Sequence, residues 1–113
     1  MWVFTQTGFL SAVRHRDEVD ALVVRARDLE SIQAIADFAK TDIITHAGSD
    51  YPYRVFIKEE DWKGFLQKAV EELDYDNYKN RMHYLRDDRF CNALSSVWSV
   101  MLRTEDLDVN SRH

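Results

Sequence analysis

The sequence predicts an α+β fold, in which an antiparallel sheet of about five strands (two hairpins) carries helices on one of its faces. Three observations lead to this prediction. Residues 1–58 contain short runs rich in Val, Ile, Phe and Tyr between turn residues, as strands do. Residues 59–102 instead carry apolar residues at helical spacing. Strands that come early and helices that come late favour one sheet with segregated helices.

Five runs are expected to form the strands: 2–5, 9–13, 21–27, 43–46 and 51–58. The first two are joined by Gln6-Thr7-Gly8, a short turn whose glycine suits a positive φ angle. The last run is opened by Pro52, the only proline, at a place where a missing N–H is tolerated. The sequence therefore begins with a hairpin.

Apolar residues at intervals of three and four predict the helices. After Asp28, a good N-cap, the first apolar side consists of Leu29, Ile32, Ile35, Ala36 and Ala39. The second consists of Trp62, Phe65, Leu66, Ala69, Val70 and Leu73. A shorter one follows with Tyr75, Tyr78, Met82 and Leu85, and the last has Phe90, Leu94, Val97, Trp98, Met101 and Leu102. Trp62 and Trp98 are therefore predicted core residues.

Length and composition indicate one folded domain. The chain has 113 residues, of which 45% are hydrophobic and 31% charged, so it can bury one core and offset the entropy of ordering. We expect a single domain over residues 1–104, followed by a flexible polar tail at 105–113.

Charge and cysteine content narrow the function classes. The formal net charge of −5 argues against broad nucleic-acid binding but leaves room for a local basic patch. Cys91 is the only cysteine, which excludes an internal disulfide and fits a reducing cytoplasm. The sequence shows no signal-peptide pattern and no apolar run of bilayer length, so a cytoplasmic location without a membrane partner is expected.

The stretch LDYDNYKNRMHY, residues 73–84, has two interpretations. Either Asp74 or Asp76 can cap a new helix, with Tyr75 and Tyr78 on its packed side. Alternatively, these four residues form an interface that binds a partner. The structural interpretation is favoured, because Asp and Asn are common at helix starts.

The best candidates for chemistry are His83, Asp87 and Cys91, which share a face if one helix runs through them. A catalytic thiol needs a base within hydrogen-bond reach, yet His83 and Cys91 are two turns apart, roughly 12 Å. Moreover, Asp87-Asp88 resembles a fresh helix start. We therefore predict a structural Cys91 and no catalytic residues.

Metal and cofactor motifs are absent from the sequence. The histidines at 15, 46, 83 and 113 are scattered, and there is no HExxH or cysteine pair. The three glycines form no phosphate-binding loop. The sequence thus predicts neither a metal site nor a cofactor.

Arginines recur in the expected strands. Arg25 and Arg27 are two apart on one strand and therefore share the face opposite its apolar side chains. Arg54 alternates with Tyr53 and Val55 and is expected on the face away from the core. Arg14 ends the second strand. If these strands are neighbours, several guanidinium groups meet on the face that the helices leave bare.

Aromatic residues accompany the arginines. Phe56 is two residues after Arg54, so strand alternation places it on the same bare face, and Tyr51 is close by. Arginines with aromatics on an exposed sheet suit an anionic or nucleic-acid ligand. The candidate ligand-binding residues are Arg14, Arg25, Arg27, Arg54 and Tyr51. The more common arrangement would be a solvated ionic face, in which the arginines pair with Asp17, Glu18, Asp28 and Asp50.

Several segments, spread over nearly the whole chain, resemble a family of small uncharacterised proteins of bacterial and phage genomes. They read MWVFTQTGFLSAV, VRAR, DYPYR, DYDNYK and VWSVM. The resemblance implies a complete single domain and carries no activity or catalytic residue with it. Its phage members imply an accessory role in a mobile element, including interference with a host defence system.

Three hypotheses for the function follow. The first is a small non-enzymatic binding protein that acts by contact with a protein partner, since no catalytic motif is present and aromatics are abundant. The second is a binder of an anionic small ligand, a nucleotide or RNA through the arginines. A hydrolase or transferase that uses His83 or Cys91 ranks last.

Overall fold

The structure is a computed structural model, which describes residues 1–107. Residues Met1–Asp74 form one compact unit, and the described residues from Tyr75 onward form a second. Each unit is described by itself. The single domain expected over 1–104 stays a prediction, as does the tail at 105–113, of which 108–113 lie outside the described residues.

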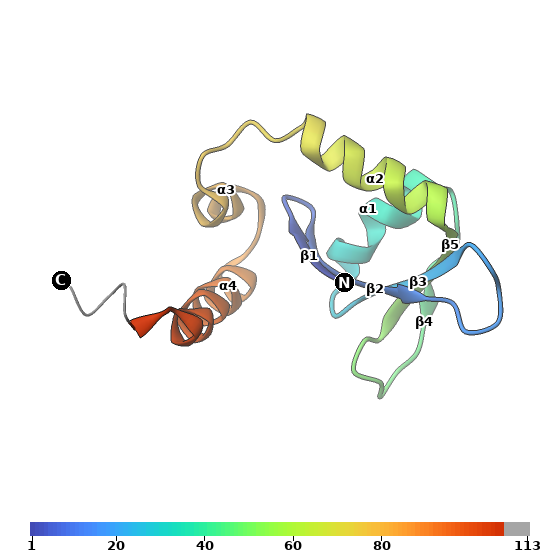
Figure 1. Cartoon of the computed structure of the whole chain (residues 1–113), viewed down its shortest axis with the longest axis horizontal. Helices are drawn as coiled ribbons and strands as arrows, with labels where there is room; N and C mark the ends of the chain where they lie inside the picture. The colour runs from blue at the N-terminus through green and yellow to red at the C-terminus, as the bar shows by residue number, and fades with distance from the viewer. Residues whose placement is uncertain (108–113) are drawn as a thin grey trace. The chain divides into compact units, whose positions relative to one another are not determined.

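The first unit contains a five-stranded antiparallel sheet (Figure 1). Its strands are β1 Trp2–Thr5, β2 Gly8–Arg14, β3 Ala21–Ala26, β4 Ile44–Thr45 and β5 Tyr53–Lys58. They lie in the order β1-β2-β3-β5-β4, which makes β1 and the two-residue β4 the edges. The predicted α+β class and antiparallel sheet are confirmed.

The residue after the β1–β2 turn, Gly8, has a backbone conformation that favours glycine. Thr5 pairs with Gly8, so the hairpin turns on two residues, Gln6 and Thr7. Gly8 has a φ angle of 137°, which L side chains rarely adopt. The predicted positive φ at this glycine is confirmed.

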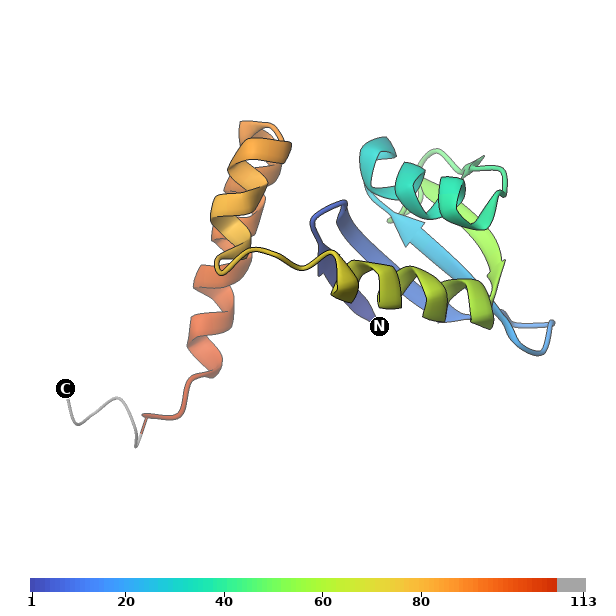
Figure 2. The ribbon, with the colours of Figure 1, turned by 90° about the horizontal axis from the view of Figure 1, so that it is seen from above.

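Two helices, α1 Leu29–Ala39 and α2 Glu59–Glu71, pack on one face of the sheet (Figure 2). Strand side chains alternate between faces, and one set enters the core beneath the helices. This core contains Leu10, Ala12, Leu22, Val24, Ala26, Ile32, Ile35, Ala36, Val55, Ile57, Trp62 and Phe65. The predicted location of α1 and α2 on a single face is thereby confirmed.

The second unit is helical, as predicted. It contains α3 Tyr78–Leu85, α4 Asp88–Met101 and a 3₁₀ turn, η1, at Leu102–Thr104. Met82, Cys91 and Leu94 form its small buried core. Helix α3 is about 12 Å long and α4 about 21 Å, from the helical rise per residue. The last turns of α4 therefore extend beyond α3, their packing partner within the unit.

Some predicted core residues are exposed. Trp62 is 5% exposed, as predicted, but Trp98 is 56% exposed, so its prediction as a core residue was wrong. Leu29, Val70 and Leu73 are exposed as well. The apolar spacing of a sequence identifies the side of a helix that is apolar, but not how far along that side a packing partner extends.

The two tryptophans lead to a stability prediction. Trp62 stacks on Phe65 in the main core, with ring centres 5.8 Å apart, so Trp62→Ala should lower the free energy of unfolding by about 3–5 kcal/mol. Trp98→Ala, the matched control at an exposed site, should cost about 1 kcal/mol or less. Urea denaturation followed by circular dichroism measures both. Equal midpoints for the two variants would contradict the assignment of Trp62 to the core.

Candidate functional site

The sheet face opposite α1 and α2, which we call the open face, carries a row of side chains across all five strands. Trp2 lies opposite Ser11, and Ser11 lies opposite Arg25. Arg25 in turn lies opposite Arg54, whose other neighbour is Ile44. Each row member alternates with core residues on its own strand, so the row belongs to the uncovered face.

Arg25 is held at the centre of this row. Its Nη2 donates a hydrogen bond of 2.8 Å to the Ser11 hydroxyl, and its guanidinium lies 4.5 Å from the centre of the Tyr51 ring. The Nε atom is buried and has no hydrogen-bond partner among the residues that the structure describes. Arg25 is therefore fixed in place with part of its donor capacity unused.

Arg54 is the cross-strand neighbour of Arg25. Within residues 1–107 its side chain makes no ion pair or hydrogen bond, and its Nε is also buried without a partner. Like charges directly opposite each other in a sheet are destabilising, and a buried unsatisfied donor adds to that cost. The two arginines thus form a locally unfavourable pair.

Tyr51 and Arg27 complete the predicted ligand-binding group around Arg25. Tyr51 is 7% exposed, and the Arg27 guanidinium lies 4.6 Å from its ring centre, so both guanidinium groups contact one ring. Arg27 Nη1 donates to the backbone oxygen of Asp50 at 2.8 Å. Over the described part of the chain, none of the three open-face arginines forms an ion pair with a carboxylate. The solvated ionic face considered from the sequence is therefore not what the described residues form.

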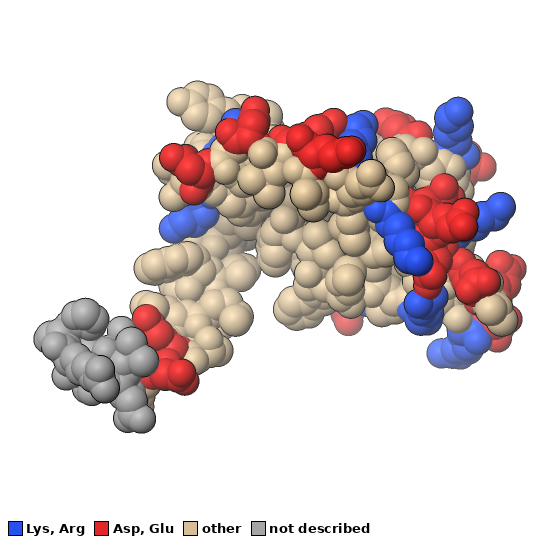
Figure 3. All heavy atoms as spheres, turned by 45° about the horizontal axis from the view of Figure 1, so that its top comes forward, with Lys and Arg blue, Asp and Glu red and all other residues tan. Residues whose placement is uncertain are grey.

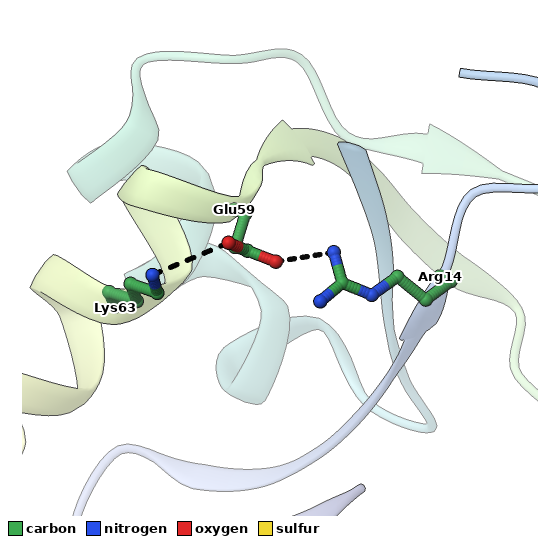
Figure 4. A network of polar contacts seen from close by, with 3 residues as sticks. All are labelled: Arg14, Glu59 and Lys63. Carbon is green, nitrogen blue, oxygen red and sulfur yellow. Dashed lines mark ion pairs between the residues drawn. The ribbon is translucent and has the colours of Figure 1, made fainter. Parts of the chain in front are cut away.

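Arg14 does not join this group. It pairs with Leu22, a core position, and therefore points to the side that the helices cover. There its guanidinium forms an ion pair with Glu59 in the first turn of α2, and Glu59 also lies 3.3 Å from the Lys63 ammonium (Figure 4). Arg14 is thus a structural ion-pair partner of Glu59.

The open face also carries aromatic residues that the sequence reasoning did not single out. Phe4 stacks on Phe9 with ring centres 4.6 Å apart, and Trp2 meets Phe9 edge-on at 5.9 Å. The alternation of side chains along a strand could have identified Trp2 and Phe4. Val3 between them packs against the core, so its two neighbours point to the opposite face. Phe56, which parity did assign to this face, is exposed.

The distribution of charge on the strands differs from that of the whole chain. The five strands contain Arg14, Arg25, Arg54 and Lys58 and no acidic residue, although the chain has 20 Asp and Glu. The described acidic residues therefore lie in helices and connections. The side of the molecule shown in Figure 3 accordingly carries acidic and basic groups in mixed order. A net acidic protein thus presents a sheet that is locally basic.

Of the four predicted interface residues, Tyr75 and Tyr78 take part in local packing, whereas Asp74 and Asp76 do not cap the next helix. The cap of α3 is Asn77, whose side chain accepts a hydrogen bond from the Asn80 N–H at 3.0 Å, so the prediction of Asp74 or Asp76 as this cap was wrong. The Tyr75 and Tyr78 rings lie 6.1 Å apart, and Tyr78 packs against the core of the second unit. Burial raises the pKa of the Tyr78 phenol, which keeps it protonated. A role of these four residues in binding a partner stays a prediction.

The three residues considered for catalysis do not share one helix. Asp87 caps α4 by accepting a hydrogen bond from the Phe90 N–H at 3.0 Å, so the chain breaks between His83 and Cys91 as expected. Cys91 is buried, and its thiol donates to the Met82 carbonyl at 3.4 Å. Cys91 is therefore a structural residue, which confirms its predicted burial.

A hollow of about 320 Å³ lies between the β1–β2 turn and the two helices of the first unit. It is lined by Thr5, Gln6, Thr7, Ala34, Asp37, Phe38, Phe65, Lys68, Ala69 and Glu72. Its charged groups already have partners: Gln33 donates to Asp37 at 2.8 Å, and Lys68 lies 3.9 Å from Glu72. The hollow therefore lacks the unused donors that mark the open face.

Residues 1–107 contain neither a metal-ligand cluster nor a membrane-spanning helix. Within that range no three His, Cys, Asp or Glu side chains gather in a way that could hold a metal ion. Among the helices of the same residues, none has the length and apolar character needed to cross a bilayer.

Comparison with protein-family models, with curated proteins and with solved structures finds no match to this chain. The resemblance noted in the sequence, and the phage-related role that it implies, therefore stay predictions.

The ion pairs of Glu59 lead to a pH-dependence prediction. Hydrogen bonds from Arg14 and then Lys63 hold the pKa of this carboxyl below its ordinary value of 4.5. Because the pKa of Glu59 is lower in the folded than in the unfolded state, ionised Glu59 stabilises the fold at pH values above its unfolded-state pKa. This stabilisation is lost as the pH falls through the folded-state pKa. Wild type should thus melt above Glu59→Gln at pH 7, and the difference should vanish in strong acid.

The matched control for this experiment is Glu60→Gln, which removes the same charge from the same helical turn. Because no ion pair to Glu60 is found among the described residues, this variant should show a smaller pH-dependent difference in melting temperature. Identical pH profiles for both variants would show that the Arg14–Glu59 contact does not stabilise the protein.

Cys91 provides a test of the structural assignment. As the only thiol of the chain and a buried one, it should react with iodoacetamide about tenfold more slowly, or slower still, in the native protein than in urea, because labelling requires local opening. Mass spectrometry of timed samples measures both rates. A native thiol that reacts as fast as the unfolded one would indicate an accessible, reactive cysteine instead.

Proposed function

We propose that this is a non-enzymatic binding protein that recognises an anionic group on its open face through Arg25 and Arg54. One observation carries the proposal. Two guanidinium groups lie directly opposite each other on neighbouring strands, each with a buried Nε that has no partner within the described residues. An anion bound by the terminal N–H groups of both would offset their mutual repulsion.

The geometry is suited to one shared ligand. Residues directly opposite in an antiparallel pair have Cα atoms about 4.5–5.5 Å apart, so the two guanidinium groups can reach the same anion. Each arginine offers a planar fork of donors, which matches the oxygens of a phosphate or carboxylate. The Ser11 and Tyr51 contacts already order Arg25, which reduces the entropy lost on binding.

The side chains of the row favour binding rather than catalysis. The row offers no histidine or carboxylate as a general base. Its single hydroxyl, Ser11, accepts a hydrogen bond from Arg25 and is buried, so it is not activated as a nucleophile. The side chains of the row can therefore bind and orient an anion, but they provide no group that would react with it.

The decisive variant is Arg54→Met, which keeps the aliphatic stem and removes the charge. With tripolyphosphate as the probe, calorimetry should show at least about tenfold weaker binding than wild type, because a charge-assisted contact contributes about 1.5–3 kcal/mol. Without the probe, the melting temperature should stay the same or rise, since the repulsion and the unpaired Nε are gone. Binding and intrinsic stability should thus change in opposite directions.

Arg16→Ala is the matched control, because it removes one positive charge from an exposed site in the β2–β3 connection. It should leave tripolyphosphate binding nearly unchanged at 0.15 M salt. The proposal is overturned if wild type does not bind the probe, or if Arg54→Met lowers stability while leaving binding intact.

Contact with a protein partner, the first hypothesis from the sequence, is the second candidate. The exposed apolar side chains of α4 favour it, since Trp and Met are enriched in interfaces. They are Val97, Trp98, Val100 and Met101. Because α4 belongs to the second unit, a partner bound there would be lost with Trp98→Ser and retained with Arg54→Met.

A further inference from the structure

We infer that the anion on the open face is the phosphate backbone of a single-stranded nucleic acid, whose bases stack on Trp2 and Phe56. The inference rests on the proposed function, because it assigns the phosphates to Arg25 and Arg54. It adds a chemical class of ligand and two further binding residues.

Trp2 lies in the same row as the arginine pair and is 70% exposed. It is on β1, two strands from Arg25, which corresponds to about 10 Å at the usual strand spacing. Its ring meets the Phe9 ring edge-on at 5.9 Å, and Phe4 stacks on Phe9 in turn. The indole therefore contacts an aromatic neighbour while most of its surface stays exposed.

Phe56 lies next to the arginine pair, further along β5. It follows Arg54 by two residues on β5, so it shares the open face at a distance of about 7 Å along the strand. Its ring is 43% exposed and meets the His15 ring edge-on at 5.6 Å. Two exposed rings thus lie near the guanidinium pair, Trp2 across the strands and Phe56 along β5.

This pattern matches how proteins hold single strands. Every base has a flat apolar face that stacks on an aromatic side chain, while guanidinium groups follow the backbone. In a duplex the bases are stacked on each other and are not free to lie on a sheet. An acidic protein segment would pair with the arginines but would leave Trp2 and Phe56 without stacking partners.

The electrostatics of the sheet are compatible with this ligand despite the overall charge of −5. None of the acidic residues that the structure describes lies in a strand, so among them no carboxylate opposes a phosphate from a strand position on the open face. At about 0.15 M salt, charges more than roughly 8 Å away are largely screened. The local basic character of the sheet then decides which ligand binds.

Fluorescence anisotropy tests the inference with four probes: a labelled ten-nucleotide oligouridine, a duplex of equal length, tripolyphosphate as competitor, and labelled polyglutamate. The oligouridine should bind most tightly. Trp2→Ala and Phe56→Ala should each weaken its binding by about 5- to 150-fold and leave tripolyphosphate binding unchanged. Trp2→Phe should restore most of the affinity, because it retains a stacking ring.

Salt dependence provides an independent measure. With two arginines on phosphates, the slope of log affinity against log salt should be about −1.4, and Arg54→Met should reduce its magnitude by about 0.7. Tyr84→Ala is the control for the aromatic variants, since Tyr84 is exposed on α3 in the other unit, and it should bind like wild type. Melting curves of each variant confirm that it is folded.

The outcomes separate the two proposals. Binding of tripolyphosphate as tight as that of oligouridine, with no effect of the aromatic variants, would overturn the inference and leave the proposed function standing. A preference for polyglutamate or for the duplex would also overturn it. Binding of none of the four probes would overturn both. If Trp2→Ala does not fold, Phe56→Ala and Trp2→Phe still decide the matter.

Discussion

The register between β3 and β5 is the constraint on which the remaining structure depends. It places Val24 opposite Val55 in the core and, one residue further, Arg25 opposite Arg54 on the open face. A slip of β5 by one residue would bury the Arg54 guanidinium beneath α1 and α2 and expose Val55. The cost of burying an unpaired charge therefore adds to the gain from apolar packing in fixing the register. The same alternation that builds the core brings the two arginines together.

Much of the first unit could be predicted from its sequence because strand alternation and turn chemistry are local signals. Gly8 indicated the β1–β2 turn, and the alternation around Arg25 and Arg54 assigned their face. The helices were less predictable. Trp98 has the spacing of a core residue, yet α4 extends past the short α3 within its unit. The length of a packing surface depends on the partner element, and the pattern of one helix holds no information about it. The cap of α3 shows a similar limit, since Asp74, Asp76 and Asn77 are all suitable and only the path of the chain selects Asn77.

The candidate site was partly accessible from the sequence for the same reason. Parity identified Arg25, Arg27 and Arg54, but the order of strands in the sheet was needed to show that Arg25 and Arg54 are direct neighbours. Arg14 was grouped with them because it ends a neighbouring strand. Its own parity with Leu10 and Ala12, both in the core, would have placed it on the covered side. Tyr51 was expected within a strand, whereas it lies in the connection before β5 and contacts two guanidinium groups from there. Contacts of this kind between a loop and a strand arise only from the tertiary fold.

The shortness of β4 has a consequence for how this sheet meets other chains. An edge strand presents unpaired backbone N–H and C=O groups that can template β-augmentation or fibril growth. With only Ile44 and Thr45 in β4, this edge offers an added strand very few backbone groups to pair with. The opposite edge, β1, is twice as long. A further strand would therefore find more backbone groups to pair with at β1 than at β4.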